Sequence, residues 1–84
     1  MNLVEVFVEE NCAACRAVIE LLDRSSADTS LMKKIFHRDK DWEEFQARGI
    51  TILPATFINR QLAFYGEFTR RDLQRQLWRL GQKP

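Results

Sequence analysis

Residues 3–15 read LVEVFVEENCAAC and hold the two features that decide the fold. The first six residues are nearly all apolar and rich in β-branched side chains, which is typical of a strand buried on both faces in the middle of a sheet. The polar residues Glu9, Glu10 and Asn11 end this strand, and Asn11 is a candidate N-cap for a helix that begins at Cys12. The pattern therefore predicts a central strand followed directly by a helix that carries both cysteines of the chain.

The predicted helix covers residues 12–24. Four of its side chains recur at helical spacing and form one core-facing stripe: Cys15, Val18, Ile19 and Leu22. A polar linker, residues 25–30, follows this helix.

The rest of the chain supplies three more strands and two more helices. Strands are predicted at residues 31–37, 55–58 and 62–65, and a tight turn joins the last two into a hairpin. The sequence DWEE at residues 41–44 has the form of a capping box, and Gly49 is a favourable residue just after the end of that short helix. Thr69, with Asp72 three residues later, is predicted to cap the last helix. The order β-α-β-α-β-β-α predicts an α/β fold, in which a four-stranded mixed sheet is flanked by three helices.

Length and composition limit the classes of function. Eighty-four residues fit a single domain, residues 1–84, and six Phe and two Trp can fill its small core. No apolar run approaches the roughly 18 residues of a membrane span, and the first residues lack a signal-peptide pattern. We therefore expect a soluble, cytoplasmic protein without membrane contact. The formal net charge of +1 argues against a nucleic-acid binder, which is normally strongly basic.

Charge is distributed unevenly along the chain. Residues 1–30 carry six acidic and two basic side chains, whereas residues 60–84 carry six basic and two acidic ones. Three arginines of the last helix recur four residues apart, opposite its leucines: Arg71, Arg75 and Arg79. This pattern is typical of a solvated helix face, and a docking patch for an acidic partner is the alternative. Trp78 lies beside the arginines, either as a contact residue or covered by a neighbouring guanidinium.

The C-x-x-C spacing of the cysteines has a mechanical reason. Residues i and i+3 are neighbours on a helix, so the sulfurs of Cys12 and Cys15 can close a disulfide with little backbone movement. The unpaired N–H groups of the first turn stabilise a thiolate at Cys12. Cys15 is deeper and is the natural resolving thiol. Two other interpretations stay open: half of a zinc site, for which His37 is the only further soft ligand, and a pair of inert core thiols.

A second motif, GITILP, occupies residues 49–54 and leads directly into a predicted strand. C-x-x-C at the start of the first helix, this segment ending at Pro54, and a hairpin ending at Gly66 together resemble the thioredoxin-like superfamily over essentially the whole chain. The resemblance implies the minimal thioredoxin-like fold, which is also that of glutaredoxins.

The resemblance also implies roles for five residues. Cys12 matches the attacking cysteine and Cys15 the resolving one. Pro54 matches the cis-proline of the family, which faces the cysteines, and Leu53 matches the residue whose backbone pairs with an extended substrate. Gly66 matches a glycine after the last strand that lets partners approach closely.

The chain also departs from the family pattern. The cysteines enclose Ala13-Ala14, where thioredoxins have Gly-Pro and glutaredoxins commonly have Pro-Tyr. The buried Asp that thioredoxins use for proton transfer has no match, because Glu5 lies too early in its strand. Glutaredoxins bind glutathione partly through Thr-Val before the cis-proline, where this chain has Ile52-Leu53.

The resemblance implies a thiol–disulfide oxidoreductase that uses a reversible Cys12–Cys15 disulfide to reduce or exchange protein disulfides, with no cofactor or metal. The expected partners are a disulfide-containing protein substrate and an electron donor, either a reductase or glutathione. Phe68 in the turn after Gly66 argues against glutathione. A glutathione-dependent glutaredoxin is one alternative. The other is a non-catalytic thioredoxin-like binding module whose cysteines act as a redox switch or a metal clip.

Overall fold

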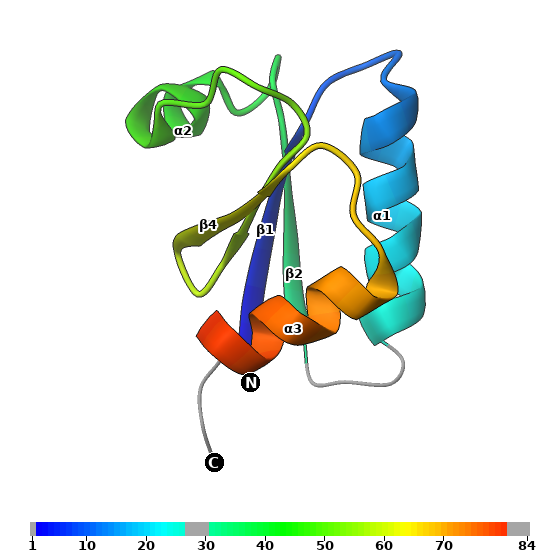
Figure 1. Ribbon diagram of the computed structural model, residues 1–84. Helices are drawn as coiled ribbons and strands as arrows, with labels where there is room; N and C mark the ends of the chain where they lie inside the picture. The colour runs from blue at the N-terminus through cyan, green and yellow to red at the C-terminus, as the bar shows by residue number, and fades with distance from the viewer. Residues whose placement is uncertain (1, 27–30, 81–84) are drawn as a thin grey trace.

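The computed structural model describes residues 2–26 and 31–80, and the elements follow the predicted order (Figure 1). They are β1 (Asn2–Val8), α1 (Ala13–Ser26), β2 (Leu31–His37), α2 (Trp42–Arg48), β3 (Ala55–Ile58), β4 (Gln61–Tyr65) and α3 (Arg70–Leu80). The main difference is at α1, which begins at Ala13 rather than Cys12 and continues to Ser26, so it includes the first two residues of the expected linker. The rest of that linker, residues 27–30, lies outside the described residues. None of the helices described is long and apolar enough to cross a membrane.

The four strands form one mixed sheet in the order β2-β1-β3-β4. β1 is parallel to β2, with Val6 opposite Ile35, and antiparallel to β3, with Val6 opposite Thr56. β3 and β4 form the antiparallel hairpin. The prediction of a buried central strand is confirmed, because β1 has a neighbour on each side and Val4–Val8 are all buried.

Alternate residues of β1 contribute to two separate cores, since successive side chains of a strand point to opposite faces. On one face Val4, Val6 and Val8 share a cluster with residues of α1 and α3, namely Cys15, Val18, Leu22 and Leu73. On the other face Phe7 packs against Phe45 of α2 and Phe57 of β3, with ring centroids 5.0 and 5.5 Å apart. Helices α1 and α3 therefore cover one face of the sheet, and α2 covers the other.

The sequence predicted the C-terminal end of α2 correctly and its N-terminal cap wrongly. Gly49 adopts a left-handed conformation (φ 63°) after the helix, and its N–H donates to carbonyls of the last turn, as predicted. The predicted capping box is wrong, because the side chain of Asp41 makes no hydrogen bond to the helix. Its carboxylate instead accepts the backbone N–H of His37 at 2.8 Å, since the turn after β2 brings that strand end beside it.

The cap of α3 does form, and it gives a pH-dependent contribution to stability. The N–H of Thr69 donates to the Asp72 carboxylate at 3.0 Å, and the Asp72 N–H donates to the Thr69 hydroxyl at 3.1 Å. The hydrogen bond from the Thr69 N–H lowers the pKa of Asp72 below its ordinary value, with further lowering from the Thr69 hydroxyl and the nearby arginines. The contribution is therefore present above the unfolded-state pKa of about 3.9 and is lost as the pH falls through the lower folded-state pKa.

We expect Asp72→Asn to lower the midpoint of urea unfolding at pH 7, because the carboxylate is the better acceptor for the Thr69 N–H. The difference from the wild type should shrink below about pH 4, where the wild-type carboxylate also begins to take up a proton. Glu67→Gln removes an exposed charge from the preceding turn and is the matched control. A difference between Asp72→Asn and wild type that stays constant from pH 7 to about pH 3 would contradict this account.

Candidate active site

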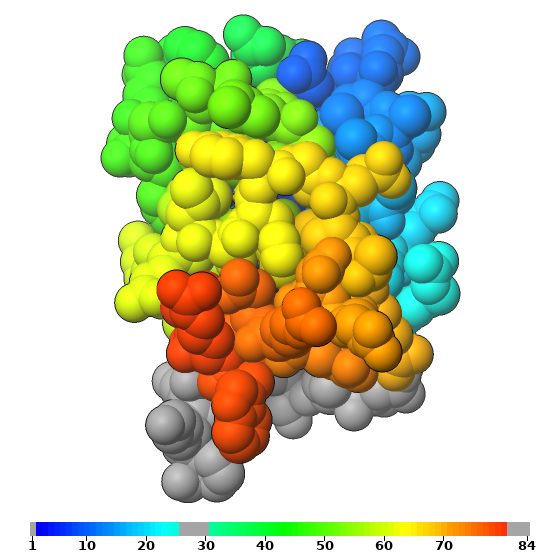
Figure 2. Space-filling model, in the orientation of Figure 1, coloured from blue at the N-terminus to red at the C-terminus, as the bar shows by residue number. Residues whose placement is uncertain are grey.

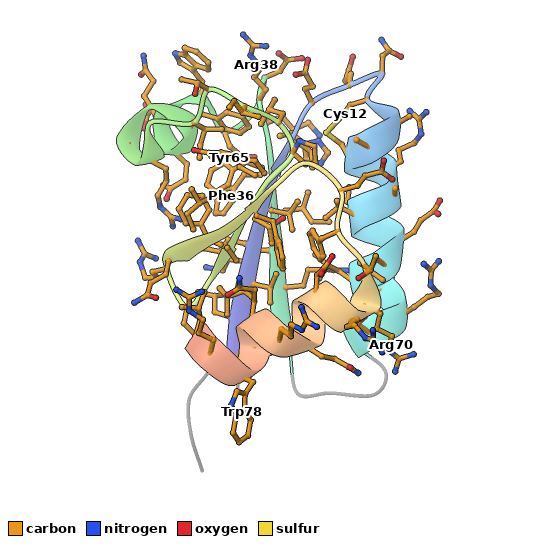
Figure 3. All side chains as sticks on the ribbon, viewed as in Figure 1. Cys12, Phe36, Arg38, Tyr65, Arg70 and Trp78 are labelled. Carbon is orange, nitrogen blue, oxygen red and sulfur yellow. A yellow bond between two sulfur atoms is a disulfide. The ribbon has the colours of Figure 1, made fainter. Side chains whose placement is uncertain are left out.

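Cys12 and Cys15 form a disulfide at the N-terminal end of α1 (Figure 3). Their Cα atoms are 5.2 Å apart, as expected for neighbours one turn apart. Cys12 is half-buried, whereas Cys15 is buried and belongs to the core cluster beneath α1. In the part of the chain that the structure describes, no three potential metal ligands come together, so the zinc interpretation gains no support from His37.

The residue that caps α1 is Cys12, not Asn11 as the sequence suggested. The Cys12 carbonyl accepts the first helical hydrogen bond from the Arg16 N–H at 3.1 Å. The Cys12 sulfur accepts the N–H of Cys15, also at 3.1 Å, which is the bond that an N-cap side chain makes. Asn11 precedes the cap with a positive φ of 54°. The Cys12 sulfur therefore already occupies the position where the partial positive charge of the helix end stabilises a thiolate.

The loop before β3 packs, through Leu53, on the same core cluster as Cys12. The Leu53–Pro54 peptide bond is cis, and Pro54 is buried. The Pro54 carbonyl accepts the N–H of Gly66 at 2.8 Å, and Gly66 itself has a positive φ of 78°. Cys12 and Leu53 pack against the core cluster to which Cys15 belongs. The structure therefore joins Pro54 to Gly66 and packs Cys12 and Leu53 on the core cluster that contains Cys15, and the roles of all five residues stay predictions.

The backbone N–H and C=O of Leu53, which precedes β3, have no backbone partner among the described residues. The neighbouring Ile52 is 53% exposed. An extended peptide could therefore pair with the Leu53 backbone as an added strand.

A cavity of about 280 Å³ opens beside this loop on the side of α2. Its apolar lining includes Phe45, Ile50 and Leu53, and Trp42 and Arg38 also line it. The Arg38 guanidinium lies 6.0 Å from the centre of the Trp42 ring. This cavity could receive an apolar side chain from a peptide paired at Leu53.

The turn after Gly66 offers few groups for a small anion. Phe68 is half-buried and stacks on Phe64, with ring centroids 4.0 Å apart. The N–H and hydroxyl of Thr69 are both engaged in the cap of α3. The N–H group of Thr69 is therefore not free for a ligand carboxylate.

The sequence analysis missed one feature of this half of the molecule, a buried ion pair beneath α2. Glu5 is 2% exposed, and its carboxylate accepts a hydrogen bond from the Arg48 guanidinium at 2.7 Å. Arg48 also lies over the rings of Phe7 and Phe57, at 5.5 and 5.0 Å. The hydrogen bond to Glu5 raises the pKa of Arg48 despite the opposing effect of burial. The signal in the sequence was Glu5 itself: a glutamate within an apolar strand is buried, and a buried glutamate is almost always paired with a cation.

The position of Glu5 also decides a question about proton transfer. Glu5 and Phe7 point toward α2, whereas Cys15 packs on the opposite face of the sheet. Glu5 is therefore not the group that takes a proton from Cys15, in agreement with the absence of a sequence match.

The cap geometry predicts which cysteine reacts first. In the reduced protein at pH 7, iodoacetamide should alkylate Cys12 well before Cys15, because Cys12 is the more accessible sulfur and receives a helix N–H. Mass spectrometry of peptides from timed samples measures the two rates. Faster labelling of Cys15 would show that the roles are reversed, and denatured protein, where the two rates should converge, is the control.

Comparisons with known proteins agree with this geometry. A family model described as a thioredoxin domain matches residues 2–78. The crystal structure of Chlamydomonas reinhardtii thioredoxin f2 superposes with a TM-score of 0.77 over 98% of this chain and 82% of that one, at 15% sequence identity. No curated protein sequence matches the chain. The structural similarity establishes the fold, and the family match, which covers nearly all of the chain and includes both cysteines, establishes membership: the chain belongs to the thioredoxin domain family, whose general activity is thiol–disulfide exchange.

Proposed function

We propose that this protein reduces or exchanges disulfides of protein substrates, with Cys12 as the attacking cysteine and Cys15 as the resolving one. The observation that carries the proposal is the position of the Cys12 sulfur, which caps α1 and accepts the N–H of Cys15. Further support comes from Leu53, which packs on the same core cluster as Cys12 and makes no backbone hydrogen bond to the described residues. We propose that the protein works in the cytoplasm, where thiols are kept reduced and disulfides between cysteines are usually transient and catalytic.

The reaction begins with the reduced protein and consists of two exchanges. The Cys12 thiolate attacks one sulfur of a substrate disulfide, so a Cys12–substrate bond forms and the other substrate sulfur leaves as a thiolate. The Cys15 thiolate then attacks the Cys12 sulfur and releases the second substrate thiolate. Two electrons have passed to the substrate, and the protein holds the Cys12–Cys15 disulfide seen in the structure. A donor thiol pair then reduces that disulfide.

The groups around Leu53 and in the turn after Gly66 favour a peptide over a small anionic thiol as substrate. A peptide can pair with the Leu53 backbone and place an apolar side chain among Phe45, Ile50 and Trp42. Glutathione carries two carboxylates and needs fixed donors or cations. The turn after Gly66 instead presents the like charge of Glu67 and the engaged groups of Thr69. We therefore infer that the electron donor is a protein reductase rather than glutathione.

A coupled NADPH assay tests the substrate and the donor together. The protein is assayed with insulin and with a small mixed disulfide, first with thioredoxin reductase and then with glutathione and glutathione reductase. We expect turnover of insulin with thioredoxin reductase to be at least about tenfold faster than with glutathione, a difference that corresponds to loss of one or two good ionic contacts. Fast turnover with glutathione and none with thioredoxin reductase would instead identify a glutathione-dependent enzyme.

The non-catalytic alternative has its own readout. Insulin reduction by dithiothreitol is measured with and without the protein. Equal rates would favour a binding module whose cysteines act as a redox switch or a metal clip, and a faster rate with the protein supports the enzyme.

A further inference from the structure

Helix α3 presents an exposed face that is basic and contains no acidic residue. Three arginines on this face, Arg71, Arg75 and Arg79, are exposed, and Gln74 and Trp78 lie between them at helical spacing. The opposite side of α3 packs on the core through Leu73, Leu77 and Leu80. Figure 2 shows α3, in orange, lying uncovered across the lower part of the visible surface.

The arginines of this face have no ionic partner in the described part of the chain. No carboxylate there lies within 4 Å of the guanidinium of Arg71, Arg75 or Arg79. The nearest acidic residue on the helix, Asp72, is engaged in the cap with Thr69, although the charges of Arg75 and Arg71 contribute to lowering its pKa. The positive charge of the face is therefore available to a partner.

Trp78 stands at the end of this face and is 83% exposed, more than any other large hydrophobic side chain described. No described guanidinium lies over its ring, so the expected alternative of a covering arginine is wrong for the described residues. Figure 3 shows the indole pointing away from the body of the molecule, at the end opposite Cys12. Exposed Trp beside Arg is the composition that carries most of the energy in protein interfaces.

The chemistry of the face points to a protein partner rather than to a nucleic acid or a membrane. The whole chain has a net charge of only +1, so no extended field would hold a polyanion. The apolar side of α3 is buried in the core, so a single indole remains for insertion into lipid. The helix of 11 residues is about 16 Å long, so one face of it limits the contact to a small interface of the transient kind.

We propose that the exposed face of α3 is a docking surface for an acidic protein segment. Carboxylates of that segment pair with Arg71, Arg75 and Arg79, and an apolar side chain packs against Trp78. Because the face lies away from Cys12, a docked partner leaves the cysteine pair open to substrate. The surface is independent of the function proposed for the cysteines.

The fluorescence emission of Trp78 reports binding in the test. Replacing Trp42 by Phe leaves Trp78 as the single indole of the chain. The probe is a synthetic helical peptide with Glu at every fourth position and Leu between them, and its Glu→Lys counterpart is the control probe. We expect saturable binding of the acidic peptide, with a blue shift of Trp78 emission that weakens as salt rises. The lysine peptide should give no shift.

Two charge reversals decide the location of the binding site. In the same background, Arg75→Glu should weaken binding of the acidic peptide at least about tenfold. Arg24→Glu, on the exposed side of α1, changes the net charge equally and should leave the affinity within about twofold. A circular dichroism spectrum and a thermal unfolding midpoint unchanged from the parent show that both variants are folded.

Several results would overturn the proposal. Absence of an emission shift with the acidic peptide would do so, as would equal weakening by Arg75→Glu and Arg24→Glu, which would show an effect of bulk charge. Tighter binding to duplex DNA or to anionic vesicles than to the acidic peptide would assign the face to another class of partner. A shift that appears with rising protein concentration alone would make the partner a second copy of this chain.

Discussion

With Cys12→Ser we expect the rate of insulin reduction to fall to that of dithiothreitol alone, because the sulfur that caps α1 is lost. Cys15→Ser is expected to stop turnover as well, but at a later step. In that variant Cys12 still attacks the substrate disulfide, and no neighbouring thiol resolves the mixed disulfide. Intact-protein mass spectrometry should therefore show a stable adduct of Cys15→Ser with a substrate thiol and none for Cys12→Ser.

The two variants are matched, since each replaces one sulfur of the same disulfide by oxygen. Thermal unfolding of both, compared with the reduced wild type, controls for loss of the fold. If Cys12→Ser accumulated the adduct and Cys15→Ser did not, the assignment of the attacking and resolving cysteines would have to be exchanged.

The second large effect is expected from the ion pair of Glu5 and Arg48. Arg48→Met leaves the carboxylate of Glu5, 2% exposed, without its principal cation. The remaining cation, Arg60, is 3.9 Å from the carboxylate and its side chain is exposed. Removing one partner of a buried pair typically costs about 3–5 kcal/mol, which is a large part of the stability of a small domain. Urea unfolding at pH 7 measures the loss.

A double variant separates the ion pair from the packing around it. Glu5→Leu combined with Arg48→Met replaces the pair by apolar side chains between the rings of Phe7 and Phe57. This variant should recover most of the stability lost in Arg48→Met alone, because no buried charge is left without a partner. A double variant that is as unstable as Arg48→Met would show that packing of the arginine, rather than charge, provides the stabilisation.

Local signals in the sequence were sufficient for the elements and for the cysteine site. The apolar run of β1, the stripe of α1 and the glycine after α2 each have a physical cause within a few residues, so they could be recognised without tertiary information. The cap of α3 is equally local, since Thr69 and Asp72 satisfy each other. The C-x-x-C spacing likewise places the sulfurs of Cys12 and Cys15 together through helix geometry alone.

Local patterns failed where a polar group had a choice of partners. Asp41 had the form of a helix cap, but the end of β2 presents the His37 N–H to it. Asn11 was the better cap by composition, yet the turn after β1 places the Cys12 sulfur over the helix end instead. In both cases the path of the chain between elements decided which donor and acceptor met.

The sequence by itself determined the order of the elements, the buried character of β1 and the identity of the disulfide pair, because periodicity and spacing express short-range geometry. Only the tertiary structure decided which distant groups meet. It joined Glu5 to Arg48 beneath α2 and packed Leu53 on the same core cluster as Cys12. It also made Asn59 a link between elements, since its side chain accepts the Leu3 N–H and donates to the Leu80 carbonyl. Such contacts depend on how the helices pack on the two faces of the sheet, and no pattern within a few residues encodes that packing.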